Sequence, residues 1–419
     1  MFNYIYLNNI AGINNEIKLD FRATPRKKEK KTTVCPIDKG ISLNKIAGII
    51  GGNASGKTSI IKAICAVGSF IGYRKMGNST LKFTSIDDIK IENDIYYILP
   101  QLSDNSPDSF AEIEMDMYIS KGKKTGFYTY MLKYTLNPKA DIKSYERLEF
   151  RKKFNDVKKI IFDIKQTKLE SELGYKYNYR ENILADYEKT DKKVYEAIKA
   201  KLEYYETFYE HYVDNSDVMV DGMLQIPMQY FYLLNWLKKD EYMVNKTIKI
   251  IDKKVDKITI EENNDTHDDE IVLYGLGNKK LSYSELSTGT KKALYLINRA
   301  LKVISNESVL LCDEIDNSLH MDLIKMILRL FILPDSKAQI IFTTNNENVL
   351  DEAIIRNDQI YCIARDNEQK INVNKYSEMP EVRYDSVFKI NYRRKNIYSE
   401  QPNDNDINNF ISYISEIKF

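Results

Sequence analysis

The residues of this chain whose types and spacing best suggest chemistry form the stretch GGNASGKT, Gly51–Thr58. Its glycines allow the backbone to bring several N–H groups close to anionic oxygens, and its lysine adds a point charge for them. The closing threonine hydroxyl is placed to hold Mg²⁺ beside the same oxygens. This spacing therefore predicts a loop that binds the phosphates of ATP or GTP.

We expect this loop and the start of the following helix to line the nucleotide. Lys57 would reach the β- and γ-phosphates and take part in catalysis, and Thr58 would be a ligand of the metal. Gly51 and Gly56 are expected to adopt backbone angles that a side chain would block. The residues predicted to contact the nucleotide here are Gly51, Asn53, Ala54, Ser55, Gly56, Lys57, Thr58 and Ser59.

A pair of adjacent carboxylates, Asp313 and Glu314, follows the apolar run Val309–Cys312. Such a run predicts a buried parallel strand, and open α/β sheets bind their ligands at the carboxyl ends of the strands. Asp313 would hold Mg²⁺ through water, and Glu314 would orient or deprotonate an attacking water. A turn without a chemical role is the alternative interpretation, which the phosphate-binding motif upstream makes less favourable.

A second helix start suited to anions lies at Ser287-Thr288-Gly289. A helix N-terminus offers unpaired N–H groups, although serine alone is a weak signal because it caps many helices. The acidic strand that follows strengthens the prediction that Ser287 and Gly289 contact the nucleotide. Gln101, in a loop further upstream, is a weaker candidate for contact with the metal, and an ordinary loop residue is the favoured alternative.

Strands and helices must bring these residues together. Apolar runs predict a strand at 46–50, before the first motif, and a helix after that motif which continues to about Ile71. Alternating patterns predict a hairpin of residues 3–10 and 16–21 and antiparallel strands within 91–150. Beyond the acidic pair we predict a helix (319–330), a strand (339–342) that ends in Thr343–Asn346, and a strand pair (359–364 and 370–375).

The composition changes near residue 150, where the chain becomes rich in Lys, Glu and Tyr. Val194–Tyr212 has apolar residues three or four apart, which is typical of a helix with one apolar face, and Met223–Leu237 predicts a buried helix. The tyrosines could stack on nucleic-acid bases, but packing in a core is the favoured interpretation. We therefore divide the chain into the N-terminal half of a domain (1–150), a helical insertion (151–255), the C-terminal half (256–376) and a tail (377–419).

The bulk composition indicates a soluble globular protein of the cytoplasm. The net charge of its 419 residues is +1, which gives no overall attraction to nucleic acid. The four cysteines are far apart and match neither a zinc knuckle nor a disulfide framework. No apolar run approaches the ~20 residues of a membrane span, so no membrane contact is expected. Contact with DNA stays open only through local basic segments, Arg26–Lys31 and Arg393–Lys395.

Together the motifs resemble an ABC-type ATPase of the branch that includes the structural-maintenance-of-chromosomes (SMC) and OLD families. GGNASGKT is similar to their phosphate loop, ELSTGTKK to their signature, LLCDEIDNSLH to their acidic strand and D-loop, and IIFTTNNENVLD to their switch segment. The chain most resembles the "AAA family ATPase" proteins of bacterial abortive-infection (anti-phage) systems, which are OLD-like without a TOPRIM domain. The resemblance implies an α/β fold, an ABC/SMC-like P-loop ATPase head with a mixed sheet flanked by helices, an antiparallel β subdomain and a helical insertion.

One position departs from the pattern of these families. Their switch segment usually carries a histidine that senses the γ-phosphate, and the matching residue here is Asn345, which we expect to be catalytic. Asparagine can donate a hydrogen bond but can neither carry charge nor shuttle a proton. Nucleotide binding is unaffected by this change, whereas the rate of hydrolysis is left open.

The resemblance also implies how such a protein works. It implies ATP and Mg²⁺ as cofactors and a homodimer, or a higher oligomer, in which Ser287 and Gly289 of one subunit face the nucleotide held by Lys57 of the other. Because the sequence contains no second catalytic set, a separate effector, a nuclease or toxin, is expected, with this ATPase as its sensor or scaffold in anti-phage defence. The alternatives are an SMC-like ATPase of DNA repair or maintenance, and a nucleotide-gated binding module with little hydrolysis.

Overall fold

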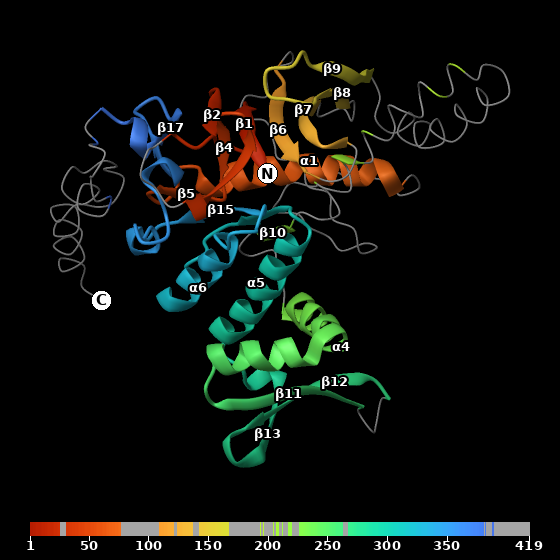
Figure 1. Ribbon diagram of the computed structural model, residues 1–419, viewed down its shortest axis with the longest axis vertical. Helices are drawn as coiled ribbons and strands as arrows, with labels where there is room; N and C mark the ends of the chain where they lie inside the picture. The colour runs from red at the N-terminus through yellow and green to blue at the C-terminus, as the bar shows by residue number, and fades with distance from the viewer. Residues whose placement is uncertain are drawn as a thin grey trace, which may run out of the picture.

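The computed structural model describes the greater part of the chain. The described residues are 1–25, 31–76, 109–120, 124–136, 142–166, 226–262 and 267–380, together with residues 193, 196, 204, 207, 208, 212, 217–219, 382 and 388. Within them the backbone forms two six-stranded sheets, a three-stranded sheet and a two-stranded sheet, with helices between them (Figure 1).

A mixed six-stranded sheet carries the predicted motifs. In spatial order its strands are β10 (Asp217–Met219), β14 (Val309–Cys312), β15 (Gln339–Thr344), β5 (Ile46–Gly51), β16 (Ile360–Arg365) and β17 (Ile371–Lys375). All neighbours are parallel except β16 and β17, which are antiparallel. The three middle strands β14, β15 and β5 are buried along their whole length, which is why they read as continuous apolar runs.

The second six-stranded sheet is entirely antiparallel. Its spatial order is β2 (Ile17–Asp20), β1 (Phe2–Asn8), β6 (Ala111–Ile119), β7 (Gly126–Leu136), β8 (Ile142–Arg151) and β9 (Lys159–Gln166). The predicted N-terminal hairpin is present, with Ile5 opposite Leu19. Polar and buried residues alternate along β6 as expected for a sheet with one face in the core. The mixed sheet and this antiparallel sheet together match the fold class predicted from the sequence.

The mixed sheet separates two hydrophobic cores. Ile49, Leu311 and Ile341 point into the core shared with α1 (Lys57–Met76) and the antiparallel sheet. Their neighbours Ile50 and Leu310 point to the opposite core, which contains α4 (Ile226–Ile251), α5 (Thr288–Ser305) and α6 (Met321–Phe331). Figure 1 shows α5 and α6 on the side of the sheet away from α1. Helices α1 and α5 therefore begin on opposite faces of one sheet.

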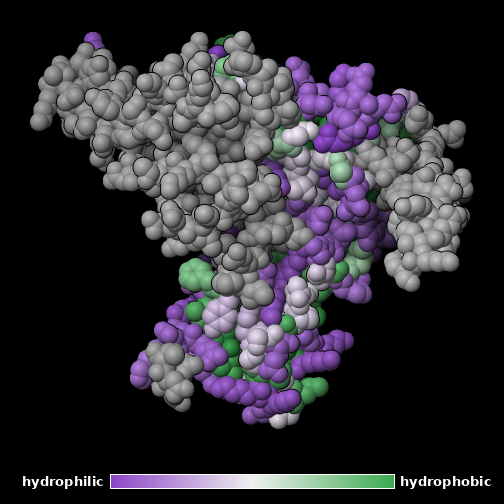
Figure 2. All heavy atoms as spheres, turned by 180° about the vertical axis from the view of Figure 1, so that it is seen from behind, coloured by the Kyte–Doolittle hydropathy of each residue, from purple (hydrophilic) through white to green (hydrophobic). Residues whose placement is uncertain are grey.

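Beyond α5, a small subdomain continues the second core. The three-stranded sheet of β11 (Val255–Glu262), β12 (Asp269–Gly275) and β13 (Lys279–Ser282) packs against α4 (Figure 1). Asn245 of α4 fastens it by bonding the backbone N–H and C=O of Ile258. From behind, hydrophilic side chains dominate the described surface, and hydrophobic ones gather over this subdomain (Figure 2). The two-stranded sheet is the hairpin of β3 (Val34–Asp38) and β4 (Ile41–Asn44).

The segment 151–255, predicted as a helical insertion, is described only in part, and its described residues are not all helical. β9 extends the antiparallel sheet to Gln166, past the predicted limit at residue 150, and β10 joins the edge of the mixed sheet. The sequence missed β9 because Ile160–Phe162 is a continuous apolar run rather than an alternating one. It missed β10 because three residues give no periodic pattern.

Two described aromatic residues of this segment pack into the head. Phe208 stacks on Tyr130 of β7 with the ring centroids 5.4 Å apart, and both are buried. Tyr212 is also buried, and its hydroxyl donates to the carbonyl oxygen of Ile64 in α1 at 2.7 Å. For Tyr212, packing in the core was the favoured interpretation of the sequence pattern. These contacts fix part of the segment against the helix that follows the phosphate-binding loop.

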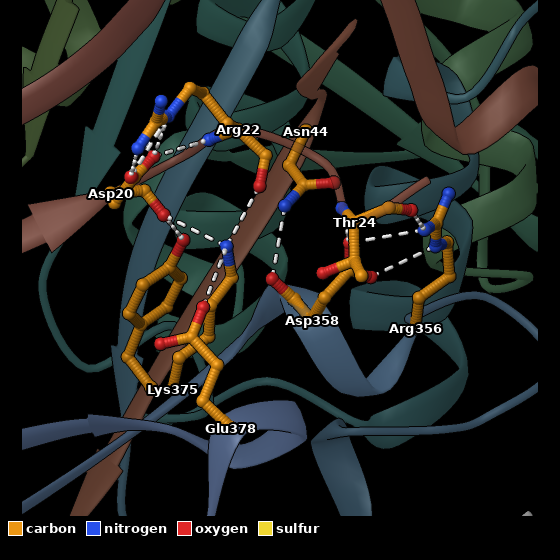
Figure 3. A network of polar contacts seen from close by, with 9 residues as sticks. Asp20, Arg22, Thr24, Asn44, Arg356, Asp358, Lys375 and Glu378 are labelled. Atoms are coloured by element: carbon orange, nitrogen blue, oxygen red, sulfur yellow. Dashed lines mark hydrogen bonds and ion pairs between the residues drawn. The ribbon is translucent and has the colours of Figure 1, made fainter. Parts of the chain in front are cut away.

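A polar network joins the N-terminal strands to the C-terminal ones (Figure 3). Asp358 is fully buried and accepts hydrogen bonds from the N–H of Thr24 at 2.7 Å and from the Arg356 guanidinium at 2.9 and 3.0 Å. Lys375 donates to the carbonyl oxygens of Asp20 and Arg22 at 3.1 and 2.7 Å, and burial lowers its pKa. The hydrogen bond between Thr24 and Asp358 joins two residues that are 334 positions apart in the sequence.

We predict that Asp358→Asn destabilises the protein, because the guanidinium of Arg356, whose side chain is only 11% exposed, would lose its carboxylate. Breaking a buried ion pair of this kind costs about 3–5 kcal/mol of unfolding free energy. The matched control is Asp20→Asn, whose pair with Arg22 has side chains 30% and 49% exposed, so that a loss below about 1 kcal/mol is expected. Urea unfolding at pH 7 measures both, and equal losses would contradict the prediction.

Candidate functional site

Three loops with chemically capable residues meet at one edge of the mixed sheet. Strands β14, β15 and β5 are parallel neighbours, with Cys312 opposite Phe342 and Thr344 opposite Ile50. Their carboxyl ends therefore lie side by side. They lead directly into the acidic pair 313–314, the switch segment 343–346 and the glycine-rich loop 51–58. This is the edge at which open α/β sheets bind ligands.

Two glycines shape the loop after β5, each for a different reason. A Cβ on Gly51 would lie 2.3 Å from the carbonyl oxygen of Ile363 on the neighbouring β16. Gly56 has a φ of +103°, and a Cβ there would also meet the Ile371 side chain at 2.3 Å. The predicted unusual backbone angle is thus found at Gly56 alone. At Gly51 the prediction was wrong in its reason, because the closeness of β16 excludes a side chain.

The lysine of this loop lies on its inner side. Lys57 is 6% exposed, and its Nζ donates to the carbonyl oxygens of Gly51 and Gly52 at 2.9 and 2.5 Å. The other predicted nucleotide contacts surround it, with Asn53 and Ala54 exposed at the tip, Ser55 buried, and Thr58 and Ser59 half-buried in the first turn of α1. Helix α1 begins at Lys57, so the positive end of its dipole lies at the same loop. Their roles in binding a nucleotide stay predictions.

An arginine that the sequence motifs did not indicate holds the loop from outside. Arg365, the last residue of β16, donates through Nε to the carbonyl oxygen of Ala54 at 2.9 Å. Its other nitrogens bond the carbonyl oxygens of Gly12 and Gln369 at 3.1 and 2.8 Å. Ala54 has a φ of +63°, which is costly for a residue with a side chain. No local pattern could have revealed Arg365, because it acts across 311 residues of sequence.

The two carboxylates differ in their surroundings. Asp313 is 2% exposed and accepts a hydrogen bond at Oδ1 from the Thr343 hydroxyl at 2.5 Å. Glu314 is half-buried and has a φ of +45°, and its N–H donates to the same hydroxyl at 2.8 Å. Its carbonyl oxygen accepts from Lys292 at 3.3 Å. The sequence pointed to the acidic pair but not to Thr343, which bonds the Asp313 carboxylate and the Glu314 N–H, or to Lys292, which bonds the Glu314 carbonyl oxygen.

The predicted signature residues lie at the start of α5. Ser287 is exposed and is the N-cap of the helix, accepting from the N–H of Thr290 at 3.0 Å. A Cβ on Gly289 would lie 2.5 Å from the carbonyl oxygen of Ser318, so the helix start packs closely on the loop after the acidic pair. Within one chain, the described contacts of this motif are therefore with the acidic loop and not with the glycine-rich loop.

The remaining two predicted site residues have different outcomes. Asn345 follows β15 at the same edge of the sheet, and within the described part of the chain its buried Oδ1 has no hydrogen-bond partner. A buried acceptor of this kind is available to a donor such as a water molecule. Gln101 lies outside the described residues, so its predicted contact with a metal stays a prediction.

The residues at this edge fit a nucleoside triphosphate with Mg²⁺. The cradle at Gly51 and Gly56 has no room for a Cβ, a long helix begins directly after it, and Lys57 supplies positive charge. Within the described residues, no cluster of three or more His, Cys, Asp or Glu side chains could hold a metal alone. The single carboxylate of Asp313 and the hydroxyl of Thr58 suit Mg²⁺, because this ion is usually held by one or two carboxylates together with phosphates and water.

The fold and the arrangement of these residues define a P-loop ATPase class, in which a glycine-rich loop and an acidic strand flank a central strand. The model of the family described as "AAA domain, putative AbiEii toxin, Type IV TA system" matches residues 46–351, more than half of the chain. The protein therefore belongs to this family of P-loop ATPases. Proteins of this class generally use ATP with Mg²⁺. No curated protein matches the sequence.

The solved structures to which this chain is similar include heads of SMC proteins. The SmcHead bound to the C-winged helix domain of ScpA is 13% identical, with 91% of this chain and 99% of that chain covered and a TM-score of 0.47. The SMC head domain from Thermotoga maritima is 15% identical, with coverages of 89% and 98% and a TM-score of 0.40. An Smc head from Pyrococcus furiosus is 12% identical, with coverages of 90% and 97% and a TM-score of 0.43.

None of the described helices is both long and apolar enough to cross a membrane.

We predict that Gly51→Ala weakens nucleotide binding by more than about 10-fold, since the loop must shift to separate the new Cβ from Ile363 and so loses aligned N–H groups. Gly40→Ala is the control. Gly40 also has a positive φ, of +77°, but a Cβ there would meet nothing within 4 Å. It should lose about 1 kcal/mol of stability and keep its affinity. Titration with a fluorescent ATP analogue separates the two, and unchanged affinity in Gly51→Ala would refute this explanation of the loop.

Proposed function

We propose that this protein hydrolyses ATP with Mg²⁺, dimerises around the nucleotide, and acts as a sensor or scaffold that controls a separate effector in an anti-phage defence system. The observation that carries the ATPase proposal is the meeting of the loop 51–58, the acidic pair 313–314 and Asn345 at the carboxyl ends of three adjacent parallel strands. One triphosphate could contact all three loops there.

The residues have distinct roles in this proposal. Lys57 binds the β- and γ-phosphate oxygens, and Thr58 and Asp313 hold Mg²⁺, whose charge offsets that of the phosphates during transfer. Glu314 orients the attacking water and accepts its proton, and Asn345 offers its unpaired Oδ1 to the same water. Asparagine cannot take up the proton, so that task rests on Glu314.

The arrangement of the signature supports a dimer. Helix α5 begins on the opposite face of the mixed sheet from α1, and Ser287 at its start is exposed. In its own chain the signature contacts Ser318, so a second protomer is needed to bring Ser287 and Gly289 to the nucleotide held by Lys57. We propose a homodimer with two shared ATP sites as the minimal assembly, which a higher oligomer would repeat.

The role in defence is inferred from the family and from the site. The family description names a toxin–antitoxin system, and the residues that meet at the carboxyl edge of the mixed sheet suit ATP. A damaging activity would then reside in a partner, a nuclease or toxin whose binding depends on the ATP state. An ATPase of DNA maintenance is the alternative. Of the basic segments that would support it, Arg26–Lys31 is described only at Lys31 and Arg393–Lys395 lies outside the described residues, so DNA contact through them stays a prediction.

We predict that Glu314→Gln lowers ATP turnover by at least about 100-fold, because the amide cannot accept the proton of the attacking water. ATP-driven dimerisation should persist, since the amide removes only one charge. A coupled phosphate-release assay and light scattering after gel filtration measure the two properties. Asp322→Asn, at an exposed acidic residue in the first turn of α6, is the control and should keep the wild-type rate. Wild-type turnover in Glu314→Gln would rule out the role given to Glu314.

A mixing experiment tests the shared site. Lys57→Ala and Ser287→Arg should each abolish turnover alone. Every site in the first homodimer lacks the phosphate-binding lysine, and every site in the second lacks the signature serine. A mixed dimer contains one intact site, so an equal mixture should recover roughly a quarter of the wild-type rate if subunits pair at random. An inactive mixture of subunits that are shown to exchange would exclude the head-to-tail arrangement.

A further inference from the structure

Thr343, the second-last residue of β15, contacts both residues of the acidic pair, the carboxylate of Asp313 and the backbone N–H of Glu314. It is fully buried on the strand that separates the phosphate-loop strand β5 from the acidic strand β14. Its hydroxyl donates to Oδ1 of Asp313 at 2.5 Å and accepts from the N–H of Glu314 at 2.8 Å. Its carbonyl oxygen accepts from the N–H of Ile315 at 3.1 Å. One residue therefore holds three successive residues of the acidic loop.

The direction of these bonds is fixed by chemistry. A backbone N–H can only donate, so the Thr343 hydroxyl must accept from Glu314 and direct its single proton to Asp313. The bond to Asp313 occupies Oδ1, and within the described residues Oδ2 has no hydrogen-bond donor. Oδ2 thus remains for a metal-bound water or for the metal. The two bonds through one hydroxyl also polarise each other.

The backbone of Glu314 needs this support. Its φ of +45° is in the left-handed region, which is unfavourable for a residue with a Cβ. Such a conformation persists where several neighbouring contacts determine it. The hydroxyl oxygen of Thr343 accepts a hydrogen bond from the N–H of Glu314, and its carbonyl oxygen accepts one from the N–H of the next residue, Ile315. The strained turn and the orientation of the Asp313 carboxylate therefore depend on the same side chain.

We propose that Thr343 is the positioning residue of the site, and that its hydroxyl sets the carboxylate of Asp313 for Mg²⁺ and the backbone of Glu314 for the attacking water together. This inference rests on the proposed ATPase function. Thr343 touches neither nucleotide nor metal and acts through the two acidic residues. Its loss therefore weakens both the use of Mg²⁺ and the chemical step, while binding of the nucleotide by the loop 51–58 stays intact.

The test compares Thr343→Val, which keeps the shape and removes the hydroxyl, with Thr343→Ser, which keeps the hydroxyl. Thr343→Val should raise the Mg²⁺ concentration for half-maximal binding of a fluorescent, non-hydrolysable ATP analogue, and lower kcat, each by about 10-fold to 100-fold. Binding of the same analogue in EDTA should be unchanged. Thr343→Ser should restore both values to within about 3-fold of wild type, because it restores the hydroxyl that orients the metal-binding carboxylate.

Thr129→Val controls for loss of a buried hydroxyl in general. Thr129 of β7 is 4% exposed and donates to the buried carboxylate of Asp116 at 2.6 Å, in the antiparallel sheet. It should change thermal stability but neither the Mg²⁺ dependence nor kcat. A Thr343→Val protein with wild-type Mg²⁺ dependence, or a Thr343→Ser protein no better than Thr343→Val, would overturn the inference. Absence of turnover in the wild type would instead refute the proposed function, and the Mg²⁺ titration would still test Thr343.

Discussion

The structure depends on the hydrogen bonding of β15 between β14 and β5. These three parallel strands are buried on both faces, so each backbone N–H and C=O must be paired in a ladder. The ladder fixes where each strand ends, and therefore where the loops 51–58, 313–318 and 343–346 begin. A slip by one residue would move every side chain of a strand to the other core. The geometry of the site is thus a consequence of sheet register.

The register in turn is held by the two cores. Alternate residues of each strand enter the core of α1 and the antiparallel sheet or the core of α4, α5 and α6. Each fully buried isoleucine or leucine contributes about 1.5–3 kcal/mol, so exchanging the faces would be far more costly than any single polar contact. This division also keeps the start of α1 and the start of α5 on opposite faces. This division supports the proposed site shared between protomers.

Part of the backbone strain in the described residues lies where the chemistry is proposed. Ala54, Glu314 and Ser318 all have positive φ without being glycine, and each lies in one of the loops at the carboxyl edge. Neighbouring groups stabilise these conformations: Arg365 bonds the carbonyl oxygen of Ala54, and Thr343 bonds the N–H of Glu314. Strained residues that are held in this way are typical of sites that must present groups in one orientation.

The sequence by itself determined the class of the protein and most of the order of its elements. The glycine-rich loop, the acidic strand and the apolar runs at 46–50, 309–312 and 339–342 are local patterns, and local patterns reflect the burial and backbone needs of their own residues. Only the tertiary structure decided what surrounds them. It placed Thr343 against the Asp313 carboxylate and the Glu314 backbone and Arg365 against the loop tip, and it added β9 and β10 where a helical insertion was expected. Such partners are brought together by strand pairing across hundreds of residues, and no periodicity within a segment can record a contact made outside it.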